Sequence, residues 1–91
     1  MRLDLFLKIS RLVPRRTVAK DLCDAGAVQL NRKAAKASAE VAPGQLLTLS
    51  AGGRVREVEI LEVPSGRISR KEAPGLYLVR REYVELEPQL F

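Results

Sequence analysis

The sequence predicts an α+β domain in which two short N-terminal helices pack on a small, mostly antiparallel β-sheet. Residues 2–31 follow the order helix, proline turn, helix, glycine stop and strand. Residues 45–63 alternate apolar and polar side chains around a Gly-Gly pair, which is typical of a β-hairpin. A chain of 91 residues, 46% hydrophobic and 30% charged, has the size and balance of one folded domain.

The first helix is expected to end before Pro14, because proline disfavours α geometry in the residue that precedes it. Asp4, Lys8 and Arg11 share one stripe of this helix, and the remaining sides are apolar enough to be buried. The Asp4 carboxylate has two interpretations. It supports the helix through the i,i+4 pair with Lys8 and the helix dipole, or it positions neighbouring arginines.

The second helix is expected over about residues 15–24, and Gly26 supplies the left-handed residue that ends it. Arg16 and Lys20 lie four residues apart on its polar side. Cys23 lies on the apolar side. The chain contains no histidine to activate this thiol, so a core cysteine is favoured over a nucleophile.

Three strands are expected in the middle of the chain. Residues 27–30 alternate and lead into a turn at 31–33, after which residues 34–41 are irregular. Residues 45–50 and 55–63 form the hairpin across Gly52-Gly53. The charged side chains of its second strand are expected to face water: Arg56, Glu57, Glu59 and Glu62.

The C-terminal third has two interpretations. Ser69 and Glu72 match a capping box, which favours a short C-terminal helix, but Pro74-Gly75 interrupts the pattern. The alternative is a loop that leads to a last strand at 76–79, and residues 85–91 are expected to fray. We therefore expect residues 1–63 to form the domain and residues 64–91 to be an extension packed on it or trailing from it.

Positive charge is concentrated near the N-terminus. Residues 1–36 carry nine Lys/Arg and three Asp, a net charge of +6, whereas residues 37–91 carry seven Lys/Arg and eight Glu, a net charge of −1. A one-sided basic patch suits a polyanion. The asymmetry favours a nucleic acid over a merely solvated face, an anionic membrane or an acidic protein.

The sequence lacks the residues that several classes of catalytic and metal-binding sites require. With no histidine and one cysteine, the sequence offers no His/Cys metal site and no catalytic triad, and it has neither GxxxxGK[ST] nor GxGxxG. We expect no catalytic site, no metal and no cofactor, and hence a protein that is not an enzyme. No apolar run approaches the roughly 20 residues that span a bilayer, and charged residues interrupt the N-terminus. A cytoplasmic location is the expectation.

The ordered motifs of the first half resemble a known family. They are Arg2-Leu3-Asp4, Arg15-Arg16-Thr17-Val18-Ala19, Ala25-Gly26-Ala27-Val28, Lys36-Ala37-Ser38 and Pro43-Gly44. This series, over about residues 1–50, resembles the S4 RNA-binding domain, also called the alpha-L motif. Gln45 departs from the aspartate usual in that family, and we expect it to affect turn capping. As a stand-alone domain of this length the chain resembles the RqcP family, which is related to the longer heat-shock S4 proteins.

This resemblance implies a non-catalytic factor of bacterial ribosome-associated quality control. Such a factor binds large-subunit rRNA and peptidyl-tRNA on the large ribosomal subunit and supports C-terminal alanine tailing with the partner RqcH. It is expected to be a monomer off the ribosome. The alternative is an accessory RNA-binding protein in rRNA or tRNA processing, modification or ribosome assembly.

The resemblance implies that Arg2 and Arg16 contact RNA, that Asp4 orients one of them, and that other basic residues contact phosphates. Together with the basic patch it gives these RNA-binding candidates: Arg2, Asp4, Lys8, Arg11, Arg15, Arg16, Lys20, Arg32, Lys33 and Lys36.

Overall fold

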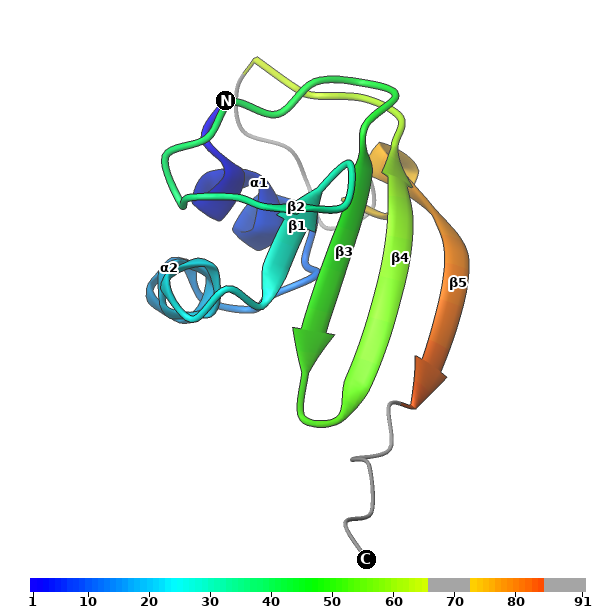
Figure 1. The fold of residues 1–91 in the computed structure, drawn as a ribbon. Helices are drawn as coiled ribbons and strands as arrows, with labels where there is room; N and C mark the ends of the chain where they lie inside the picture. Colours follow the sequence, from blue (N-terminus) through cyan, green and yellow to red (C-terminus); the bar gives the residue numbers. More distant parts are fainter. Residues whose placement is uncertain (66–72, 85–91) are drawn as a thin grey trace, which may run out of the picture.

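The computed structural model describes residues 1–65 and 73–84. Two helices, α1 (Leu3–Ile9) and α2 (Arg16–Asp24), precede the strands β1 (Val28–Leu30), β2 (Lys33–Ala34), β3 (Leu46–Ala51) and β4 (Arg54–Ile60). A 3₁₀ turn, η1 (Ala73–Leu76), leads into β5 (Tyr77–Val84). The strands form one antiparallel sheet in the order β2-β1-β3-β4-β5, and the helices lie beside its β1 end (Figure 1). The expected α+β class is confirmed.

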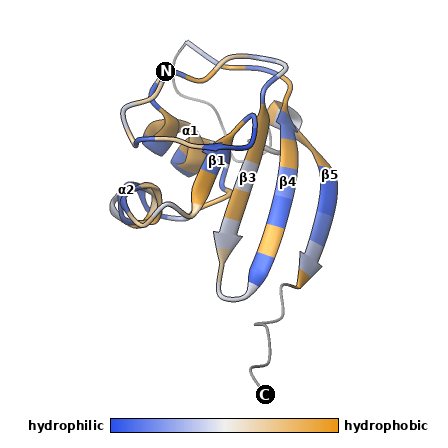
Figure 2. Cartoon of the chain, viewed as in Figure 1, coloured by the Kyte–Doolittle hydropathy of each residue, from blue (hydrophilic) through white to orange (hydrophobic). Residues whose placement is uncertain are grey.

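The core lies between the helices and one face of the sheet. Leu3, Phe6 and Leu7 of α1 are fully buried and pack with Val28 and Leu47 of the sheet. Figure 2 shows the corresponding pattern, with α1 largely apolar and β4 alternating between polar and apolar residues. This packing fixes α1 on the sheet and thereby fixes the polar groups at its N-terminal end.

Helix α1 is shorter than the sequence predicts. It ends at Ile9, because Arg11 adopts a left-handed backbone with a φ of 64° and its N–H bonds to the Lys8 carbonyl at 3.1 Å. Arg11 therefore lies beyond the helix. The prediction that Arg11 shares a helical stripe with Asp4 and Lys8 is wrong. The chain then turns through Pro14 into α2.

The end of α2 confirms the predicted glycine stop. Gly26 has a φ of 76°, its N–H bonds to the Cys23 carbonyl at 3.0 Å, and the Ala27 N–H bonds to the Leu22 carbonyl at 2.9 Å. These two bonds form a Schellman motif, which satisfies the last carbonyls of the helix. The turn directs the chain into β1 and holds α2 against the sheet.

The predicted hairpin across Gly52-Gly53 is present, with β4 ending at Ile60 rather than Val63. Gln45 caps the turn before β3, since its side-chain Oε1 accepts a hydrogen bond from the Ala42 N–H at 2.8 Å. Residues 33–34, expected to be turn and irregular chain, pair with β1 as a short strand. Near the C-terminus the last-strand interpretation is confirmed, although β5 is longer than predicted. Residues 73–76 form only a 3₁₀ turn, and Ser69 and the tail at 85–91 lie outside the described residues.

One charged residue of β4 does not face water as predicted. Glu57 is only 7% exposed, and its carboxylate lies 3.9 Å from an Arg32 guanidinium nitrogen. Thr48 and Arg81 flank it directly on the neighbouring strands. Long side chains on these strands therefore cover part of the sheet face that is turned away from the helices.

None of the helices described is long and apolar enough to cross a membrane. Residues 1–65 and 73–84 also contain no cluster of three or more His, Cys, Asp or Glu side chains that could hold a metal ion.

Candidate nucleic-acid interface

A buried carboxylate lies at the centre of the N-terminal face. Asp4 is 3% exposed, and its Oδ1 accepts hydrogen bonds from Arg2 Nε at 3.2 Å and from the Leu5 N–H at 2.8 Å. Its Oδ2 accepts a hydrogen bond from Arg2 Nη2 at 3.3 Å and lies 3.4 Å from Arg16 Nε. One carboxylate thus joins an arginine that precedes α1 to the first residue of α2.

The backbone holds Asp4 in this position. The N–H groups of Leu3 and Asp4 bond to the carbonyls of Ala39 and Ala37, at 2.8 and 3.1 Å. Both N–H groups belong to the first turn of α1 and have no partner within the helix. The segment 35–41 that follows β2 therefore lies against the start of α1 and covers the Asp4 side chain.

The arginines keep the buried carboxylate ionised. Burial alone would raise the pKa of Asp4, but hydrogen bonds from Arg2, Arg16 and the Leu5 N–H, with the charge of Arg16, lower that pKa below its usual 3.8. Asp4 pairs with these two arginines rather than with Lys8. Of the two interpretations of Asp4, the structure therefore confirms the positioning of arginines.

The two arginines have donors to spare. Each side chain is 47% exposed although it is bonded to Asp4. Arg16 approaches Asp4 through Nε, and Arg2 through Nε and Nη2. Among the described residues, both terminal nitrogens of Arg16 and Nη1 of Arg2 therefore remain for other acceptors. Guanidinium groups held in this way match the oxygens of phosphates in a forked geometry, and less side-chain entropy is lost on binding.

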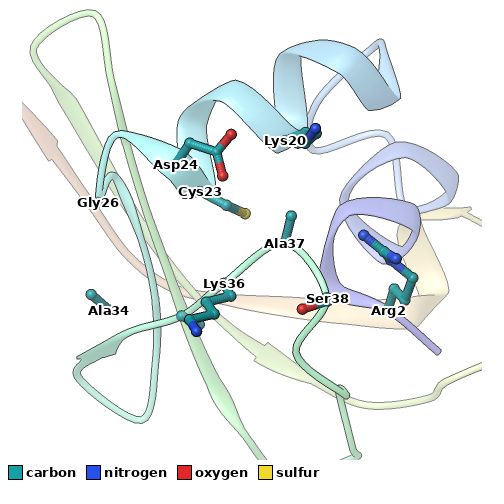
Figure 3. A pocket seen from close by; sticks show the side chains of 10 residues that line it. Arg2, Lys20, Cys23, Asp24, Gly26, Ala34, Lys36, Ala37 and Ser38 are labelled. Carbon is teal, nitrogen blue, oxygen red and sulfur yellow. The ribbon is translucent and has the colours of Figure 1, made fainter.

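A shallow depression of about 540 Å³ adjoins Arg2 (Figure 3). Arg2 lines it from the start of α1, Lys20 and Asp24 from α2, and Lys36 and Ser38 from the segment after β2. Three of the predicted candidates, Arg2, Lys20 and Lys36, thus share one concave surface. The sequence analysis did not select Ser38 or Asp24 as candidates. Ser38 lies in the Lys36-Ala37-Ser38 motif, and Asp24 lies one turn after Lys20.

Five other candidates are exposed but do not line this depression. Lys8 lies on α1, Arg11 follows that helix and Arg15 immediately precedes α2. Arg32 and Lys33 lie at the β1–β2 turn, and Arg32 points toward Glu57 of the sheet. The structure therefore gathers some of the predicted residues into one site and distributes the rest around it.

Cys23 is confirmed as a core residue. It is 6% exposed, and burial, with the charges of Asp4 and Asp24, raises the pKa of its thiol to about 11. A thiol with such a pKa stays neutral at physiological pH and is a poor nucleophile. Cys23 also lines the depression.

Comparison with known proteins identifies the fold family. The S4 domain profile matches residues 1–47, more than half of the chain. The "RQC P-site tRNA stabilizing factor" of Bacillus subtilis is 42% identical over 82 residues, which cover 90% of this chain and 94% of that protein. The chain belongs to the S4-domain family of RQC P-site tRNA stabilizing factors. A protein of the same name from Helicobacter pylori strain 26695 is 40% identical over 78 residues, 86% of this chain and 93% of that protein.

Solved structures agree with this assignment. The solution structure of the hypothetical protein HP1423 superposes with a TM-score of 0.77 at 38% identity, over 89% of this chain and 98% of that one. The trimeric structure of Vibrio cholerae heat shock protein 15 gives a TM-score of 0.79 at 30% identity, over 87% and 80% of the two chains. The fold is therefore shared by the quality-control family and the heat-shock S4 proteins.

Proposed function

We propose that this protein is a non-catalytic RNA-binding factor of ribosome-associated quality control. In this role it binds large-subunit rRNA and peptidyl-tRNA on large subunits that remain after a stalled ribosome has split. The family name of its relatives, which refers to stabilising a P-site tRNA, supports this role. The basic N-terminal face supplies the surface, and the work is done in the cytoplasm, where ribosomes translate.

The observation that carries this proposal is the Arg2–Asp4–Arg16 cluster. Burial of Asp4 requires a positive partner, yet both arginines on it stay 47% exposed, so they can also contact a ligand. Two oriented guanidinium groups on a face with a net positive charge suit neighbouring phosphates of a structured RNA. The remaining basic candidates then contribute long-range attraction, which salt weakens.

In the same role, the protein holds the tRNA while the partner RqcH adds C-terminal alanines to the nascent chain. The protein itself supplies binding energy and no chemical step in this scheme. We expect it to act as a monomer when it is off the ribosome, because the proposed contacts all come from one copy of the chain.

Gradient sedimentation of cell lysate tests the proposal, with Arg16→Ala compared to wild type. We expect the wild-type protein to migrate with large subunits that carry peptidyl-tRNA, and Arg16→Ala to weaken this association by about 1–3 kcal/mol, a loss typical of one oriented arginine. The matched control is Arg54→Ala, which removes an exposed arginine at the far end of β4 and should leave migration unchanged.

Two results would contradict the proposal. If folded Arg16→Ala migrates as the wild type does, Arg16 is not part of the interface. If the wild-type protein migrates with free RNA or with subunits regardless of peptidyl-tRNA, the accessory role in RNA processing, modification or assembly takes its place.

A further inference from the structure

The depression beside Arg2 has an apolar floor and a rim that carries charged side chains. Two small, largely buried residues that line it, Cys23 and Ala37, form its floor (Figure 3). Its volume of about 540 Å³ lies within the roughly 300–1,000 Å³ of pockets for small ligands. A flat, planar group can lie on such a floor without displacing a large side chain.

The rim carries a carboxylate that phosphate binding does not explain. Asp24 projects from the last turn of α2 toward the open middle of the depression, opposite Arg2 (Figure 3). Within the described ranges it forms no ion pair, even with Lys20 one turn earlier. A negative charge at a helix C-terminus is unfavourable for the helix and repels phosphates. Asp24 therefore suits a ligand group that donates hydrogen bonds.

We propose that this depression takes one unpaired base of the bound RNA and that Asp24 selects guanine. The base lies on the floor formed by Cys23 and Ala37, and Arg2, held by Asp4, faces the same space. Unpaired bases are the usual targets of sequence-specific RNA recognition, and arginine planes stack on them. Lys20 and Lys36 on the rim contact the phosphates on either side of that nucleotide.

The choice of base follows from the donors that each base presents. On its Watson–Crick edge guanine offers two adjacent N–H donors, which match the two oxygens of one carboxylate. Cytosine and adenine offer an amino group beside a ring nitrogen that accepts, and uracil offers one N–H between two carbonyl oxygens that repel a carboxylate. The expected order of preference is guanine, then cytosine or adenine, then uracil. Ser38, with a hydroxyl that donates and accepts, adds no strong preference.

This inference rests on the proposed RNA-binding function and deepens it. The test measures the affinity of the full chain for five RNA hairpins at low ionic strength by fluorescence anisotropy. Four hairpins carry one unpaired nucleotide in the stem, G, A, C or U, and the fifth is fully paired. We expect the G hairpin to bind about tenfold more tightly than the U or the fully paired hairpin, a typical discrimination by one base contact.

Two matched variants assign the preference to its residue. Asp24→Asn should abolish the preference for G, while Asp21→Asn should keep it. Both changes remove one negative charge from an exposed position of α2, so both should raise the affinity for the U hairpin and the fully paired hairpin to a similar degree by electrostatics. Ala34→Leu places a larger side chain at an exposed position that lines the depression. It should therefore reduce the difference in affinity between each hairpin with an unpaired nucleotide and the fully paired hairpin.

The outcomes separate this inference from the function on which it rests. Equal binding of all five hairpins by the wild type, or an identical response of Asp24→Asn and Asp21→Asn, would overturn the base pocket and leave the arginine interface in place. If Arg16→Ala binds every hairpin as tightly as the wild type does, the proposed arginine interface is wrong, whereas a preference for G that depends on Asp24 would still support the base pocket. If the wild type binds none of the hairpins, both are wrong.

Discussion

The two ends of this domain use ion pairs in opposite ways. At the helical end, Asp4 is buried and holds two half-exposed arginines, which keep N–H donors without a partner among the described residues. Along β4 and β5, Arg56 pairs with Glu82 and Arg80 with Glu59, each arginine having a carboxylate of its own. Charges on the strands thus largely neutralise one another, whereas the helical end has an excess of positive charge. This difference supports the proposal that the helical end is the binding surface and that the strands present a solvated one.

Loss of the buried carboxylate should cost the most stability. Asp4→Asn keeps the volume but removes the charge, and the amide nitrogen meets a guanidinium donor, so we expect unfolding free energy to fall by about 1–3 kcal/mol. The arginines can be solvated again, which keeps the loss below the roughly 3–5 kcal/mol of a fully buried pair. Urea unfolding measures the difference.

The matched change on the sheet is Glu59→Gln. Its pair with Arg80 is partly exposed, so the expected loss of unfolding free energy is about 0–1 kcal/mol. Equal losses from Asp4→Asn and Glu59→Gln would contradict the distinction between the two ends.

A smaller effect is expected from pH. Because the folded-state pKa of Asp4 is lowered, its carboxylate contributes stability that is fully present above its unfolded pKa and is lost as pH falls through the folded value. The stability difference between wild type and Asp4→Asn should therefore be constant from neutral pH down to about pH 5 and shrink below about pH 4. Urea unfolding over this range measures it, and a difference that instead grows on acidification would contradict the assignment.

Sequence alone predicted much of the fold, since local signals determine it. The Gly26 stop, the Gly52-Gly53 hairpin and the alternating strands all depend on residues within a few positions of one another. The last strand was harder, because the apolar residues at 76–79 fit either a helix or a strand until β4 provides a partner.

The geometry of the site depends on longer-range contacts. Asp4 and Lys8 have the spacing of an exposed helical pair, but the carbonyls of Ala37 and Ala39 bring a loop over the start of α1 and bury Asp4. The family resemblance singled out Arg2 and Arg16, whereas only the fold shows that both bond to one carboxylate. Glu57 was misassigned for the same reason, since residues on three other strands or turns surround it.

The most direct test of the oriented arginines is the affinity of Asp4→Asn for large subunits that carry peptidyl-tRNA, measured beside Asp21→Asn. Each change raises the net charge by one, and long-range attraction alone predicts tighter binding for both variants. Because Asp4 positions Arg2 and Arg16, we predict that Asp4→Asn binds about tenfold more weakly, the loss expected for one well-placed contact, while Asp21→Asn binds equally or slightly more tightly. Tighter binding by both folded variants would show that charge alone, and not the geometry around Asp4, makes the interface.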